Sequence, residues 1–128
     1  MSYTIKNLRE IEDAAARFGL SDVQEARFAA RELDAEATGL ALLLVRPGQR
    51  QPFAHRHNQA EEVYVVLRGS GRVKLDDEIR EVRAMDAIRV APTVTRAFEA
   101  GPEGLELLAL GAKHSGDAEM VREDVWAE

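Results

Sequence analysis

Residues 48–69 read GQRQPFAHRHNQAEEVYVVLRG, and this stretch decides both the fold and the place of the candidate site. Side chains two residues apart on a β-strand point to the same face. His55 and His57 therefore project together, with Phe53 beside them if the strand extends that far. Four residues separate His57 from Glu62, which begins a second strand. The face that carries the two histidines is the first place to look for chemistry.

The strand that begins at Glu62 is apolar on both of its faces. Tyr64 and Val66 share the face of Glu62, while Val63 and Val65 point the other way. A strand with two apolar faces is covered on both sides. One face is therefore predicted to line the interior of a barrel, and the other to meet a second layer or a second subunit.

Further strand-length segments surround this stretch, and Gly, Pro and Asp residues separate them. Short strands at this spacing are typical of a β-sandwich or barrel rather than of alternating strands and helices. The predicted strands cover residues 40–45, 62–68, 72–75, 79–83, 87–90, 94–98 and 105–110.

The two flanks of the chain carry weaker signals. Asn7 and Glu10 resemble a capping box, which predicts a short amphipathic helix over residues 8–18. Local propensity also favours a helix over residues 22–36, although the alternation within this segment fits a strand equally well. Residues 113–128 are mostly polar and are predicted to pack back across the barrel or a partner.

Length and composition exclude several classes of protein. The chain has 128 residues, no cysteine and a net charge of −6. It fits one domain, with a helix and lead-in strand over 1–38, a barrel over 39–112 and a tail over 113–128. The charge argues against nucleic-acid binding, and no apolar run is long enough to span a membrane. We expect a cytoplasmic protein without a nucleotide cofactor, because no Gly-rich phosphate loop is present.

The two histidines and the glutamate can serve as metal ligands. Two neutral imidazoles and a carboxylate can supply three ligands to iron, manganese, nickel or zinc and leave positions open for water or substrate. The other interpretation is that His55 and His57 are partly exposed strand residues and that Glu62 pairs with a neighbouring arginine. Residue types and spacing alone leave both interpretations open.

The same residues resemble the first motif of the cupin superfamily. His55, His57, Glu62 and Gly69 match that motif in type and spacing, although Gly48 stands one residue too far upstream. The resemblance covers about residues 39–112. It implies an all-β fold, a single double-stranded β-helix (jelly-roll) barrel with a short N-terminal helix in front, commonly assembled as a homodimer. It also implies a divalent metal at the three ligands.

The second cupin motif is degenerate in this chain. Alignment on Asp86, Pro92 and Phe98 places Arg96 where the family has its third histidine ligand. A guanidinium stays protonated and has no lone pair to offer a metal. The only other histidine, His114, falls after the last predicted barrel strand and is interpreted as a residue of the tail.

Two arrangements of the pocket follow from Arg96. In one, Arg96 turns away and the two histidines with Glu62 still bind a metal. In the other, the guanidinium takes the place of the metal, pairs with Glu62 and anchors a small carboxylate or another anion. In both, Tyr64, Phe98 and Phe53 are predicted to form the core and the wall of the ligand pocket.

Three functions from different classes remain open at this point. The first is a metal-dependent enzyme, such as a dioxygenase or an isomerase, in which Arg96 orients an anionic substrate. The second is a metal-free module that binds a small molecule through Arg96. The third is a structural or regulatory dimer with a vestigial pocket. A fold supports many activities, so the resemblance alone names no reaction.

Overall fold

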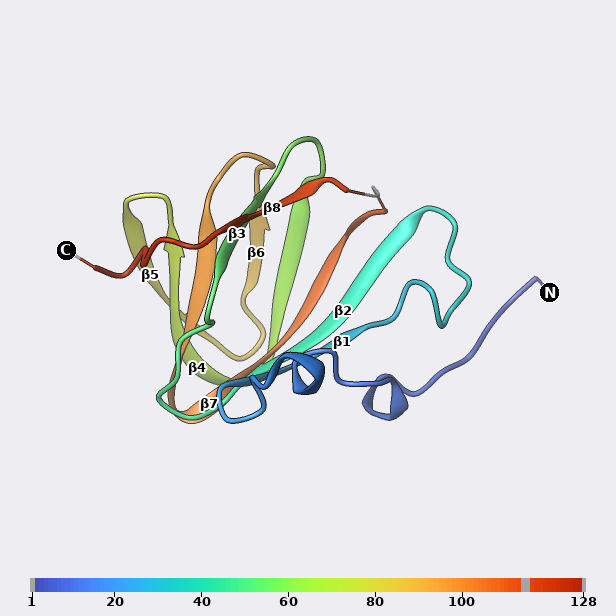
Figure 1. The fold of residues 1–128 in the computed structure, drawn as a ribbon, viewed down its shortest axis with the longest axis horizontal. Helices are drawn as coiled ribbons and strands as arrows, with labels where there is room; N and C mark the ends of the chain where they lie inside the picture. Colours follow the sequence, from blue (N-terminus) through green and yellow to red (C-terminus); the bar gives the residue numbers. More distant parts are fainter. Residues whose placement is uncertain (1, 114–115, 128) are drawn as a thin grey trace.

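The computed structural model describes residues 2–113 and 116–127, and its strands form one strongly curled antiparallel sheet (Figure 1). This architecture confirms the predicted all-β fold. The strands are β1 (Gln24–Phe28), β2 (Thr38–Val45), β3 (Ala54–His57), β4 (Glu62–Leu75), β5 (Glu78–Arg83), β6 (Ala87–Val90), β7 (Arg96–Ala112) and β8 (Ala118–Val121). One path through the sheet runs β1-β2-β7-β3-β8, and β4 pairs with β5, β6 and β7.

Two long strands, β4 and β7, connect the halves of the barrel. Strand β4 joins two predicted segments, 62–68 and 72–75, into one strand. Strand β7 likewise joins segments 94–98 and 105–110, although residues 94 and 95 lie before its start. The glycines between them mark bends instead of strand ends. A Cβ at Gly69 would lie 2.0 Å from the carbonyl oxygen of Gly104, so only glycine permits the close approach of the two backbones.

The core lies inside the curl of the sheet and consists mainly of valine, leucine and two aromatic rings. Tyr64 of β4 and Phe98 of β7 are each 1% exposed, and their rings meet edge to face with centroids 4.9 Å apart. Val66 of β4 and Leu107 of β7, which also face inward, are fully buried. This core fixes the position of β4 relative to β7. Because β4 begins at Glu62, the core also fixes the position of the glutamate.

The predicted helix over residues 8–18 is wrong. This segment contains only two 3-10 turns, η1 (Leu8–Glu10) and η2 (Ala16–Phe18). The connection between them is bound to β1, because Asp13 accepts hydrogen bonds from the backbone N–H groups of Ala15 and Ala26. These contacts with β1 replace the hydrogen bonds that would continue a helix.

For residues 22–36 the predicted helix is wrong, and the strand interpretation is confirmed only over Gln24–Phe28, because turns and coil follow this strand. β1 pairs with β2 along its whole length, from Gln24 opposite Val45 to Phe28 opposite Ala41. Pairing with a neighbouring strand supplies hydrogen bonds and a partner surface that an isolated Ala-rich segment lacks, and it outweighs helix propensity here.

The C-terminal segment packs back against the barrel, as predicted. β8 pairs with β3, and His55 lies opposite Met120 in this ladder. In Figure 1 this segment crosses the front of the molecule beside β3. His114, which the sequence analysis assigned to the tail, lies outside the described residues. Within the described part of the chain, we find no helix long and apolar enough to cross a membrane.

Candidate metal centre

The strands β3 and β4 bring the two histidines and the glutamate together, although they do not pair with each other. Both are tied to β7: His55 lies opposite Arg96, and Glu62 lies opposite Gly111. A Cβ at Gly111 would lie 2.9 Å from the carbonyl oxygen of Glu61, so the glycine permits the close approach of β7 to the start of β4. Long-range strand pairing therefore creates the cluster that the motif predicts.

One carboxylate oxygen is the centre of the cluster. Oε1 of Glu62 lies 3.2 Å from Nε2 of His55 and 3.1 Å from Nε2 of His57. The Tyr64 hydroxyl donates a hydrogen bond of 2.6 Å to the same oxygen. His55, His57 and Glu62 each offer one ligand atom, and these three atoms all lie within 4.8 Å of one another.

These separations fit a divalent cation. Ligands that bind at roughly 2.1 Å and at right angles lie about 3 Å from each other. In addition, Nε2 of His57 is buried and has no hydrogen-bond partner among the described residues, although it lies 3.1 Å from Oε1 of Glu62. A buried nitrogen left with an unused lone pair or proton is unusual in a protein interior, and a metal ion would use that lone pair.

The ring of His57 is held from its other side by Asp117. Nδ1 of His57 lies 3.1 Å from Oδ2 of Asp117. The Asp117 carboxylate is itself buried and accepts hydrogen bonds from the backbone N–H groups of Gln59 and Ala60, each of 2.9 Å. A carboxylate that accepts the Nδ1 proton leaves Nε2 free to bind a metal, which is the usual support of a metal-binding imidazole.

The charge state of the cluster follows from these contacts. Burial raises the pKa of Glu62, but hydrogen bonds from His55 and Tyr64 and the charges of the imidazoles outweigh it and lower the pKa from 4.5 to about 2. Burial, together with the charge of Glu62, raises the pKa of the Tyr64 hydroxyl well above its ordinary value. At neutral pH the centre therefore combines an ionised carboxylate with a protonated tyrosine.

Arg96 lies behind this cluster. Its side chain is 0% exposed, and Nη1 is 3.5 Å from Oε1 of Glu62. Nη2 donates a hydrogen bond of 2.8 Å to the carbonyl oxygen of Ala91. The guanidinium thus adds a buried positive charge next to the carboxylate, while the three ligand atoms remain close together.

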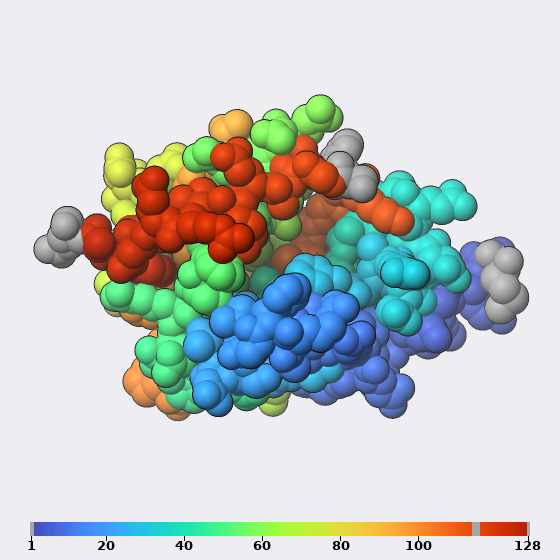
Figure 2. All heavy atoms as spheres, viewed as in Figure 1, coloured from blue at the N-terminus to red at the C-terminus, as the bar shows by residue number. Residues whose placement is uncertain are grey.

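The cluster lies at a cavity of about 250 Å³. In Figure 2 the molecule is hollowed between the N-terminal part of the chain (blue) and the C-terminal segment (red), and residues of β1 and β8 are among those that line this cavity. Among the site residues predicted from the sequence, Phe53 and Tyr64 line the cavity together with the two histidines and Glu62. Of the described residues around the cavity, neither Arg96 nor Phe98 is part of the lining.

The sequence analysis did not identify the residues that the N-terminal and C-terminal segments contribute to the site. Asp117 precedes β8, Met120 lies within it, and Phe28 comes from β1. No local motif marks these residues. Only the pairing of β8 with β3 and of β1 with β2 places them near the histidines, so the sequence alone carries no clear signal for them.

Comparison with known proteins places the fold in a family. The model of the cupin domain matches residues 41–111, which is more than half of the chain. The chain belongs to the cupin family. The recognition from its first motif is thereby confirmed, and the degenerate second motif is a departure within the family.

Solved structures of other cupin-fold proteins agree with this assignment. A cupin protein from Bacteroides fragilis is 23% identical with a TM-score of 0.70, and the match covers 91% of this chain and 88% of that one. A polyketide cyclase from Streptomyces resistomycificus is 19% identical with a TM-score of 0.75, covering 94% and 87%. Oxalate decarboxylase from Bacillus subtilis is 21% identical with a TM-score of 0.73, covering 92% of this chain and 33% of the other. No curated protein matches the sequence significantly. At these identities the likeness concerns the fold.

Proposed function

We propose that this cupin holds a divalent metal, one of iron, manganese, nickel or zinc, in its barrel through His55, His57 and Glu62. We further propose that a small anionic ligand binds beside the metal. The observation that supports this most is the convergence of the two imidazole nitrogens on one carboxylate oxygen, at 3.2 and 3.1 Å. A bound divalent ion would polarise an oxygen atom of the ligand and offset its negative charge.

The protein's own residues prepare the site for this role. Asp117 orients His57, and Tyr64 donates a hydrogen bond to Glu62. Two neutral imidazoles and the ionised Glu62 carry one negative charge, which the neighbouring Arg96 offsets. An anionic ligand therefore depends on the ion for its attraction. Two structural neighbours are described as enzymes, a polyketide cyclase and an oxalate decarboxylase. Their names do not carry over to this chain, for which we propose dioxygenase or isomerase activity on the chemistry of the three ligands alone.

A metal-free pocket is the second candidate, and the position of Arg96 favours it. Its guanidinium lies 3.5 Å from the same carboxylate oxygen and balances the charge of Glu62 without an ion. Against this candidate, the side chain is fully buried and is not part of the cavity lining. An anion in the cavity would have to displace Glu62 or Tyr64 to reach it.

Elemental analysis by mass spectrometry tests the metal proposal. The protein is prepared untagged and without chelators, and is also loaded in turn with each of the four metals. We expect close to one ion per chain, and almost none in the double variant His55→Ala, His57→Ala. Arg56→Ala is the matched control, because Arg56 lies between the histidines and its side chain pairs with Glu119 at the surface. Absence of metal after loading would favour the metal-free pocket.

We propose separately that the protein forms a homodimer, as the resemblance to the family implies. Sedimentation equilibrium of the same preparations tests it. A mass that stays at one chain over a wide concentration range would contradict the dimer and leave the metal proposal untouched.

A further inference from the structure

The walls of the cavity beside the cluster are mostly apolar. They combine side chains from β1, β2 and β8 with the segment that precedes β3. The large apolar residues of these walls are Phe28, Leu43, Phe53 and Met120, and four alanines fill most of the remaining lining. Phe28 and Met120 are 61% and 50% exposed, so a ligand in the cavity could cover apolar surface that now faces water.

The walls offer no second site for a negative charge. None of the described residues that line the cavity is a lysine or an arginine. The polar groups outside the metal cluster are the neutral amides of Gln24 and Gln51. The side-chain oxygen of Gln51 already accepts a hydrogen bond from the backbone N–H of Phe98, which leaves its amide nitrogen as a donor. A second anionic group placed against these walls would therefore lose contacts with water and gain no cationic partner from the described lining, at an energetic cost.

The size of the cavity limits the ligand further. An apolar cavity of about 150 Å³ in a protein core is large enough for benzene. The present cavity of about 250 Å³ therefore has room for a single ring with a few substituent atoms. Within the described lining, charged side chains lie only where His55, His57 and Glu62 are, and the amides of Gln24 and Gln51 can serve neutral polar groups alone.

We propose that the ligand is a small aromatic molecule with its anionic oxygen donors, a phenolate or a carboxylate, gathered at one end. The donor end lies at the His55–His57–Glu62 cluster, and the ring lies between Phe28, Phe53 and Met120. This inference rests on the proposed metal site and narrows its ligand class. It excludes dicarboxylates with separated charges, because their second charged end would meet the apolar walls.

Calorimetric titration of the zinc-loaded protein with salicylate and with succinate tests the inference. We expect salicylate to bind at least about tenfold more tightly, because its ring buries apolar surface while succinate must bury a second carboxylate. The double variant Phe28→Gln, Met120→Gln should weaken salicylate binding by about tenfold. Both positions are exposed, so the variant should fold normally. Ile79→Gln on β5, equally apolar and outside the cavity, is the matched control and should leave the affinity unchanged.

The possible outcomes separate this inference from the metal proposal. If zinc binds but succinate binds as tightly as salicylate, or the double variant binds salicylate unchanged, the aromatic ligand class is rejected and the metal site stands. If no metal binds, the metal proposal fails, and the metal-free protein is titrated with phenol and followed by NMR. Shifts confined to cavity residues would then support an aromatic pocket, and their absence would reject it.

Discussion

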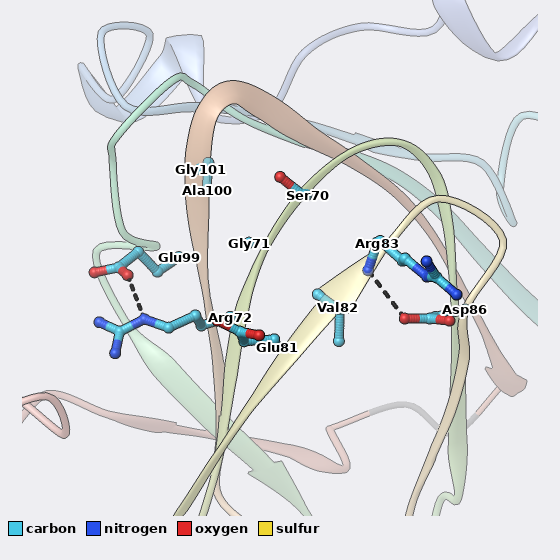
Figure 3. A pocket seen from close by; sticks show the side chains of 10 residues that line it. All are labelled: Ser70, Gly71, Arg72, Glu81, Val82, Arg83, Asp86, Glu99, Ala100 and Gly101. Carbon is cyan, nitrogen blue, oxygen red and sulfur yellow. Dashed lines mark hydrogen bonds and ion pairs between the residues drawn. The ribbon is translucent and has the colours of Figure 1, made fainter.

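Among the hollows in the described part of the molecule, two that each contain a carboxylate surrounded by positively charged or hydrogen-bonding groups differ in kind. The larger, about 670 Å³, lies over β4, β5 and β7 and includes Glu99 (Figure 3). Glu99 is paired with Arg72 and Arg50, whose side chains are 40% and 45% exposed. The smaller hollow, about 250 Å³, contains Glu62 among buried or half-buried partners.

The comparison shows that neither size nor charge makes a metal site. Arginine has no lone pair, so the partners of Glu99 neutralise it and supply no further ligand for a cation. A deprotonated imidazole nitrogen does have a lone pair, and the Nε2 atoms of His55 and His57 both lie next to the oxygen of Glu62. Burial then decides how strongly each carboxylate depends on its partners, which can be tested on matched variants.

The largest expected difference between the two hollows concerns stability. Glu62→Gln removes the charge next to the buried Arg96 guanidinium, so the free energy of unfolding should fall by about 3–5 kcal/mol. Glu99→Gln breaks contacts with exposed arginines and should cost less than about 1 kcal/mol. Urea unfolding at pH 7 measures both. Equal losses in the two variants would show that Glu62 and Arg96 do not form a buried pair.

Low pH should also show how strongly the fold depends on the ionised carboxylate of Glu62. The pKa of Glu62 is lowered from 4.5 to about 2 in the folded state, so the unfolded chain binds this proton more readily. The resulting stabilisation, about 3 kcal/mol, is fully present above pH 4.5 and is lost as the pH falls toward 2. Unfolding curves between pH 6 and 2 should show this loss in the wild type and lack it in Glu62→Gln. A parallel decline in both proteins would contradict the lowered pKa.

A smaller effect is expected at the support of His57. Asp117→Asn keeps the shape of the side chain but weakens its hold on the Nδ1 proton, and metal affinity should fall by about 10- to 100-fold. Glu119→Gln, two residues further along and exposed, is the control. Nitrogen NMR of the His57 ring in the metal-free variant should show a mixture of tautomers. An unchanged tautomer together with unchanged affinity would limit Asp117 to ordering the loop at Gln59 and Ala60.

The smallest expected change is a gain. Arg96→His replaces a positive charge by a neutral nitrogen donor at the β7 position opposite His55. Metal affinity, measured by competition with a chelator, should rise by about tenfold, because repulsion is removed and a fourth donor is added. If metal uptake does not change, Arg96 does not occupy the position of the third histidine in the family.

Much of the barrel could be predicted because strand periodicity and turn residues are local. The predicted strand over 87–90 coincides with β6, and that over 79–83 lies within β5. The breaks predicted between residues 68 and 72 and between residues 98 and 105 were wrong, because long strands bend where a glycine such as Gly69 lets two backbones approach closely. The helix over 8–18 was wrong because contacts between Asp13 and β1 compete with local propensity.

The sequence by itself determined which atoms can bind a metal and that His55 and His57 share one face, since residue type and a two-residue spacing are enough. Tertiary structure alone decided that Asp117 reaches His57 across 60 positions of the chain and that Arg96 is buried behind Glu62. It also decided that apolar residues of β1 and β8 line the cavity. These contacts depend on which distant strands pair, and that pairing is a property of the whole sheet.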